Sequence, residues 1–198
     1  MRPALILALI VALTGCGPAI SPIAAVSPSV APTSIASGPR ISAPPVTPPT
    51  PPGNDLPAFA CTDASGGTKG VANTIAARMA ELSGYDRFVL QLDSIVPTFT
   101  VKRQAKPVFP QGAGGQTLTL LGTAGVLVQV HSATGATTFT GPTDIVHPEF
   151  KVLQEARQTE DFEGYVSWGL GLSRPACMRV FTLADPARLV VDFQATTS

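Results

Sequence analysis

The sequence is poor in charge and contains no long basic or acidic run. Its 198 residues include 13 Lys plus Arg and 13 Asp plus Glu, so the formal net charge is zero at pH 7. The small basic cluster Lys102, Arg103 and Lys106 is interpreted as a solvated strand end. Binding to nucleic acid usually needs a clustered basic face. The sequence therefore predicts no nucleic-acid partner.

Residue patterns of enzyme and metal sites are also missing. The two histidines, His131 and His147, are not spaced as a metal-binding pair, and no CxxC motif occurs. No serine lies in a Gly-x-Ser-x-Gly motif, and the glycine-rich stretch 112–115 lacks the Gly-Lys-Ser/Thr of a phosphate-binding loop. We therefore expect no catalytic residue, no metal and no cofactor. A small secreted hydrolase with a Ser/His/Asp triad is the weakest alternative.

Long hydrophobic runs are absent as well. The apolar run from Ala4 to Leu13 is too short for a permanent membrane helix and suits an export signal. It ends in Leu13-Thr14-Gly15-Cys16, which resembles the lipobox of bacterial lipoproteins. This resemblance implies a signal peptide at residues 1–15 and a diacylglyceryl group on Cys16. The lipid would hold the protein on the extracytoplasmic face of a cell membrane. The alternative is an ordinary secretory signal.

Residues 16–57 are rich in proline, serine and threonine, and Arg40 is their single charge before Asp55. No apolar period of a helix or a strand is present, and frequent proline favours extended polyproline II. We predict a disordered linker here, followed by one domain at residues 58–198.

Three cysteines occur in the chain. With Cys16 assigned to lipid, Cys61 and Cys177 remain as a pair in an exported, oxidising environment. We predict a disulfide bond between them.

Period-2 alternation predicts the fold of the domain. From Val166 to Leu172, apolar residues alternate with serine or glycine, as in a strand with one face against a core. This places Trp168 in the core and Tyr165 on the opposite face. The segment 71–80 fits either a helix or a strand. Further strands are predicted at Phe88 to Leu92, Thr98 to Arg103, Thr117 to Leu121, Val126 to His131, Phe150 to Arg157 and Leu189 to Phe193.

About eight short strands with turns between them predict an all-β protein, a single antiparallel β-sandwich or a partly closed barrel. Within the fold, we expect Asp86 to pair with Arg87, and Arg188 with Asp192, and so to fix turns and register at strand ends.

Four short motifs occur in order along the domain: Gly84-Tyr85-Asp86-Arg87-Phe88-Val89, Phe162-Glu163-Gly164 followed by Trp168-Gly169-Leu170-Gly171-Leu172, Arg179-Val180-Phe181, and Asp185-Pro186-Ala187-Arg188-Leu189-Val190-Val191-Asp192. Together they resemble the AMIN-like domain of bacterial lipoproteins, over about residues 70–194. That domain is a relative of the AMIN modules attached to cell-wall amidases and secretin-type pore proteins. The resemblance implies a β-sandwich without catalytic activity that localises its host to peptidoglycan or the septum. It also favours a strand at 71–80.

The sequence thus predicts a non-enzymatic, lipid-anchored cell-envelope protein that binds peptidoglycan or other cell-wall glycan, or localises to wall-associated machinery. The alternative is a protein–protein interaction module at the cell surface. Tyr165 is the candidate ligand contact, because an exposed aromatic ring can stack on the apolar face of a sugar.

If the lipid on Cys16 is the attachment to the membrane, replacing this cysteine removes it. We expect Cys16→Ser to abolish metabolic labelling with a fatty acid and to release the protein from membranes. Labelling that persists in this variant would disprove the anchor.

Overall fold

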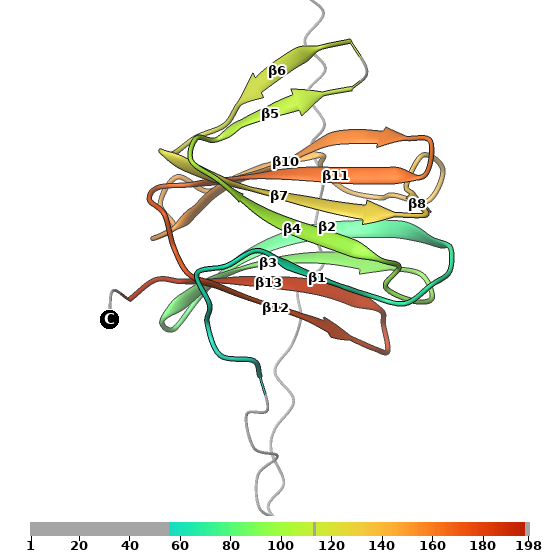
Figure 1. Cartoon of the computed structure of the whole chain (residues 1–198), viewed down its shortest axis with the longest axis horizontal. Coiled ribbons are helices and arrows are strands. Elements are labelled where there is room, and N and C mark those ends of the chain that lie inside the picture. Colours follow the sequence, from blue (N-terminus) through green and yellow to red (C-terminus); the bar gives the residue numbers. More distant parts are fainter. Residues whose placement is uncertain (1–55, 113, 197–198) are drawn as a thin grey trace, which may run out of the picture. The chain divides into compact units, whose positions relative to one another are not determined.

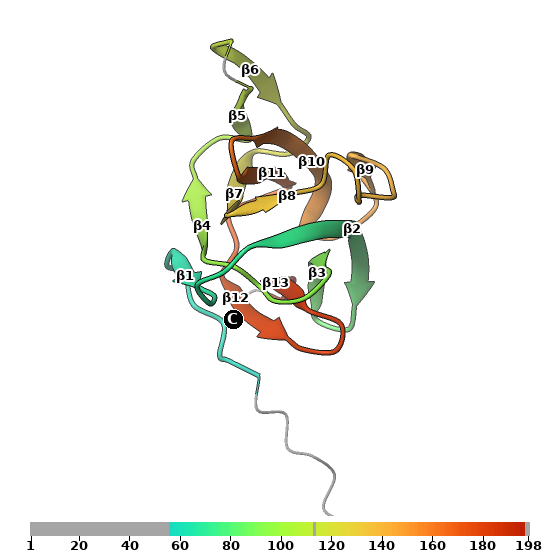
Figure 2. The ribbon, with the colours of Figure 1, turned by 90° about the vertical axis from the view of Figure 1, so that its right-hand side faces the viewer.

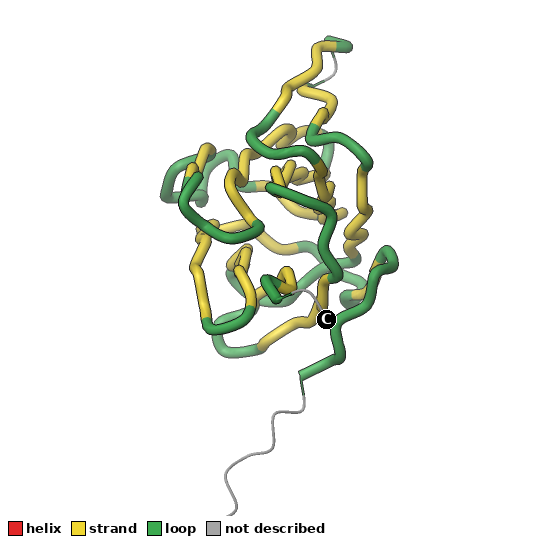
Figure 3. Tube along the Cα trace, turned by 90° about the vertical axis from the view of Figure 1, so that its left-hand side faces the viewer, coloured by secondary structure: helices red, strands yellow, loops and turns green. Residues whose placement is uncertain are grey.

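The computed structural model describes residues 56–112 and 114–196, which form strands and turns (Figure 1). The predicted signal peptide, Cys16 and nearly all of the predicted linker lie outside the described residues. In the described part, no helix is long and apolar enough to cross a membrane. Strands and loops alternate along the whole described trace (Figure 3).

Two sheets form the body of the domain, and a small hairpin lies beside them (Figures 1 and 2). The six-stranded sheet has the order β1-β4-β7-β11-β10-β9, and the five-stranded sheet has the order β12-β13-β3-β2-β8. Strands β5 and β6 pair only with each other. The strand bounds are β1 Ala64–Gly66, β2 Ala72–Leu82, β3 Tyr85–Leu92, β4 Phe99–Gln104, β5 Val108–Gln111, β6 Gln116–Thr119, β7 Ala124–His131, β8 Ala133–Thr134, β9 Asp144–Val146, β10 Leu153–Phe162, β11 Tyr165–Leu172, β12 Met178–Leu183 and β13 Arg188–Gln194.

The predicted all-β fold is confirmed. The strands pair antiparallel except for β2 with β8, and one further parallel bridge joins Thr68 to Pro97 outside the strands. More strands are present than expected, because β1, β5, β8 and β9 have four residues or fewer and show little alternation. The strand predicted at Thr117 to Leu121 is β6, Gln116–Thr119. The ambiguous segment 71–80 is a strand, since β2 pairs with β3 as a hairpin. The strand predicted from Phe150 begins later, at Leu153, and continues to Phe162.

Trp168 lies at the centre of the core. Its side chain is fully buried between the two sheets, with ring centroids 5.6 Å from Phe88 and 5.8 Å from Phe139. Val128 of β7 and Leu90 of β3 are equally buried. The inward face of β11 therefore carries the large apolar residues, as its alternation predicts.

The outward face of β11 is also buried from Ser167 to Gly171, which the alternation did not predict. Phe109 of β5 packs there against Gly169, where an added Cβ would lie 2.7 Å from its ring. The hairpin is tied to β10 at both ends: the Gly112 amide donates to the Thr159 carbonyl at 3.2 Å, and the Leu121 amide donates to Glu155 Oε2 at 2.8 Å. Glycine on β11 thus leaves room for the β5–β6 hairpin.

Asp86 joins the two sheets. Its buried carboxylate lies on β3 of the five-stranded sheet and accepts hydrogen bonds from the backbone amides of Val152 and Leu153, at 2.6 and 3.0 Å. Leu153 begins β10 of the six-stranded sheet, and Val152 directly precedes it. The expected pair of Asp86 with Arg87 is wrong, because adjacent residues on a strand point to opposite faces.

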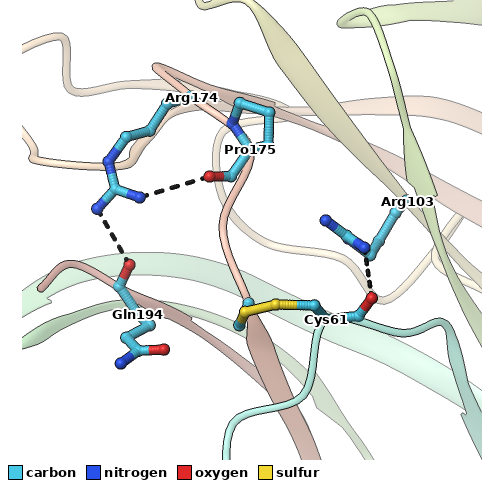
Figure 4. The surroundings of a disulfide bond; sticks show 6 residues. Cys61, Arg103, Arg174, Pro175 and Gln194 are labelled. Atoms are coloured by element: carbon cyan, nitrogen blue, oxygen red, sulfur yellow. Dashed lines mark hydrogen bonds between the residues drawn. A yellow bond between two sulfur atoms is a disulfide. The ribbon is translucent and has the colours of Figure 1, made fainter. Parts of the chain in front are cut away.

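The predicted disulfide between Cys61 and Cys177 is confirmed (Figure 4). It links the segment before β1 to the residue before β12 across 116 positions of sequence. Ala60 and Met178 exchange backbone hydrogen bonds of 2.8 and 2.9 Å beside it. Arg103 also donates to the Cys61 carbonyl. The start of the domain is therefore fixed to the edge of the five-stranded sheet.

Replacing Asp86 with alanine leaves two buried backbone amides without an acceptor. We expect Asp86→Ala to lower the free energy of unfolding by about 2 to 4 kcal/mol in urea denaturation. The control is Asp144→Ala, which removes a half-exposed ion pair to Arg157 and should cost less than about 1 kcal/mol. Equal effects of the two substitutions would show that Asp86 does not join the sheets.

Candidate functional site

The histidines of the domain serve local contacts. His147 Nδ1 lies 2.8 Å from Glu149 Oε1, and its ring stacks on Phe150 at 4.5 Å between centroids. His131 contacts the ring of Tyr165. In the part of the chain that the structure describes, no group of three or more His, Cys, Asp or Glu side chains could hold a metal.

Three aromatic residues occupy opposed positions on the outer face of the six-stranded sheet. Tyr165 of β11 stands opposite His131 of β7 and Phe162 of β10 in the strand registers. Directly opposed residues share a face of the sheet. The centroids of Tyr165 and His131 are 4.9 Å apart, and Phe162 and Tyr165 are 57% and 41% exposed. We call these three residues the aromatic row. It lies on the face opposite Trp168, as predicted for Tyr165.

A groove lined mostly by residues with polar side chains adjoins the aromatic row. Its volume is about 400 Å³, and it lies between β10 and the β5–β6 hairpin, with Phe162 at one end. The side chains of Gln111, Gln116 and Glu160 supply amide and carboxylate groups along it. The Asp161 carboxylate accepts hydrogen bonds from Thr134 Oγ1 and the Gly135 amide, and Thr159 Oγ1 is buried. The lining residues are Gln111, Gly112, Gln116, Thr159, Glu160, Asp161 and Phe162. Hydrogen-bonding groups beside an exposed aromatic ring are the chemistry that a sugar requires. We call this feature the hairpin groove.

Phe162 and the groove were not predicted as site residues. The sequence held a signal for Phe162 in the dipeptide Glu163-Gly164, since glycine is common in tight turns. In the structure both residues have positive φ, 50° and 79°, and form a two-residue turn between β10 and β11. A two-residue hairpin turn places its flanking residues opposite each other, here Phe162 and Tyr165. Gln111 and Gln116 gave no such signal, because their strands are short and pair only with each other.

A second group of side chains lies on the outer face of the five-stranded sheet. Arg87 of β3 donates from Nε and Nη2 to the two carboxylate oxygens of Asp192, at 2.6 and 2.9 Å. Arg179 of β12 donates from Nε to the same carboxylate at 2.7 Å. Asp192 is fully buried, and its hydrogen bond raises the pKa of Arg87 above the usual value. We call these three residues the arginine cluster.

The cluster corrects the expected pair of Arg188 with Asp192. Four residues along one strand separate these two by about 13 Å, whereas Arg87 and Arg179 stand directly opposite Asp192 on the neighbouring strands. Arg188 instead donates to the Pro186 carbonyl at 3.1 Å. The partner of Asp192 is decided by the order of the strands in the sheet. The local sequence pattern does not contain this order.

Aromatic rings hold both arginines of the cluster. The Arg179 guanidinium carbon is 4.6 Å from the ring centroids of Phe59 and of Tyr85. That of Arg87 is 5.3 Å from Tyr85 and 5.5 Å from Phe181. These distances are within the range of cation–π attraction. The two guanidinium groups are therefore fixed both by a carboxylate and by stacking.

Comparison with protein families matches residues 72–195 to the AMIN-like domain. The match spans more than half of the 198 residues. The chain belongs to the AMIN-like family. A search of curated proteins finds no match. AMIN-like domains are non-catalytic modules of the cell envelope, so membership implies an extracytoplasmic location. The aromatic row, the hairpin groove and the arginine cluster all lie within the matched residues of this AMIN-like domain.

Removing the carboxylate of Asp192 leaves two largely buried guanidinium groups without a counter-ion. We expect Asp192→Ala to lower the free energy of unfolding by about 2 to 4 kcal/mol. Arg188→Ala should change it by no more than about 0.5 kcal/mol, as for an ordinary surface substitution. Urea denaturation of both variants measures the difference. A cost for Arg188→Ala as large as that for Asp192→Ala would contradict the pairing described above.

Proposed function

We propose that this AMIN-like domain binds the glycan strands of peptidoglycan and catalyses no reaction. The observation that carries the proposal is the pair of exposed rings, Phe162 and Tyr165, beside the hairpin groove. Family membership supports it, because AMIN-like domains belong to the cell envelope. The proposal includes attachment to the membrane through lipid on Cys16 and a spacer formed by residues 16–57.

Two neighbouring, partly exposed aromatic side chains offer apolar area that a ligand can cover. A pyranose presents C–H groups on its faces and hydroxyl groups around its edge. The rings of Phe162 and Tyr165 suit the faces, and the amide and carboxylate groups of the groove suit the hydroxyls. The aromatic row and the groove together therefore match both parts of a sugar unit.

Weak binding at one site suffices for this function. A dissociation constant of about 1 mM corresponds to about −4 kcal/mol. A wall polymer repeats its binding unit many times, and a membrane anchor keeps the domain close to that polymer, so effective concentration adds to retention.

A second candidate function is pairing of a sheet edge with a partner protein. β12 forms one edge of the five-stranded sheet and pairs on one side with β13. On its other side, Met178 bridges to Ala60. An extended peptide could add to the rest of such an edge. This function would give protein crosslinks and no retention on purified wall.

The test of the proposed function uses the full chain carrying Cys16→Ser and purified peptidoglycan. We expect co-sedimentation, and we expect Phe162→Ala and Tyr165→Ala each to reduce the bound fraction about fivefold or more, because stacking area is lost. Tyr165→Phe retains the ring and should bind nearly as well as the parent. Val146→Ala, an exposed position on β9 of the same sheet, is the matched control.

Absence of sedimentation with peptidoglycan from several sources would reject glycan binding and favour the edge-pairing candidate. Retention that is unchanged by Phe162→Ala and by Tyr165→Ala would reject the aromatic row as the contact.

A further inference from the structure

The outer face of the five-stranded sheet is basic, although the sequence shows no basic run. Strand alternation and register place four arginines at its outward positions, with Asp192 as the acidic residue among them. The basic residues are Arg78, Arg87, Arg179 and Arg188. Over the outward positions of β2, β3, β12 and β13 alone, the four arginines and Asp192 give a net charge of +3. We call the four residues the arginine face. A surface of this sign attracts anions.

The two arginines of the cluster keep donors for a further ligand. Arg87 uses Nε and Nη2 on Asp192, and Arg179 uses Nε. Nη1 of Arg87 and both Nη groups of Arg179 make no hydrogen bond within residues 56–112 and 114–196. The side chains of Arg87 and Arg179 are 23% and 13% exposed. Stacking between rings fixes them before any ligand binds, which lowers the entropic cost of binding.

The surface between the arginines is apolar. Val89 of β3 and Phe181 of β12 stand opposite Val190 of β13 in register. Val190 is buried, so the accessible apolar area is that of Val89 and Phe181, which are both partly exposed. A highly hydrated polymer such as a polyphosphate would leave this strip without a matching group. A short peptide with small apolar side chains and free carboxylates matches both the strip and the guanidinium groups.

We propose that the arginine face binds the free carboxylates of the stem peptides of peptidoglycan. That the peptide comes from peptidoglycan rests on the proposed function. That the face prefers an acidic peptide rests on its charge and its apolar contacts alone. The domain then has separate surfaces for the two parts of the wall polymer, the glycan strand and its peptide.

The probes are stem peptides released from purified peptidoglycan by an amidase, and the glycan strands left behind. Arg78 and Arg188 are the positions to change, because they lie outside the arginine cluster. Within the described part of the chain, their side chains donate to Gln91 Oε1 and to the Pro186 carbonyl, respectively. With the full chain carrying Cys16→Ser, we expect the double variant Arg78→Gln, Arg188→Gln to raise the Kd for released peptides about fivefold or more.

The matched control is Lys69→Gln with Lys102→Gln, which removes the same charge from a loop and from the other sheet. It should change the Kd by no more than about twofold. Peptides whose carboxylates have been amidated should not bind. Equal effects of the two double variants, equal binding of amidated peptides, or tighter binding of polyphosphate than of peptide would each overturn the inference.

The two probes, stripped glycan strands and released peptides, test the aromatic row and the arginine face independently. Phe162→Ala should reduce binding to the stripped glycan strands and leave peptide binding unchanged. Binding of the parent to stripped strands but not to peptides would reject the arginine face and leave the proposed function standing. Binding to peptides but not to strands would reject the aromatic row and support the arginine face.

Discussion

Glycine on the outward face of β11 determines which part of the six-stranded sheet is open to solvent. Gly169 lies against the ring of Phe109, and Gly171 lies against the backbone of Leu121. Any larger side chain at these positions would push the β5–β6 hairpin away. The hairpin covers this half of the outer face. Phe162 and Tyr165, near the other end of β11, therefore lie beside the hairpin and not on an open sheet. Close packing at two glycines thus creates the groove some distance away.

The motif around Asp86 shows how neighbouring residues serve opposite faces of one strand. Asp86 points inward and accepts hydrogen bonds from β10, while Arg87 points outward to Asp192. A change of register by one residue would exchange these roles and bury an arginine in the core. The pairing of β3 with β13 is therefore specified by charge as well as by apolar packing.

Local sequence pattern was sufficient for the fold class, the long strands and the burial of Trp168, because each depends on alternation within one segment. The family resemblance resolved the segment that became β2. Contacts between distant strands could not be predicted in this way. The partner of Asp192 depends on the sheet order, and the hairpin over β11 depends on Phe109 meeting glycines from two other strands. The arginine face was missed for the same reason, since its residues come from four strands and no two of them are adjacent in sequence.

The disulfide at the start of the domain has a mechanical consequence. Tension applied to the chain before residue 56 reaches Cys61 and passes covalently to Cys177 at the edge of the five-stranded sheet. Strand β1, which pairs only three residues with β4, follows Cys61 and is bypassed by this load. Without the covalent link, the same pull would peel β1 from its sheet one pair at a time. A domain pulled at its N-terminal side therefore does not depend on the pairing of its first strand to resist the force.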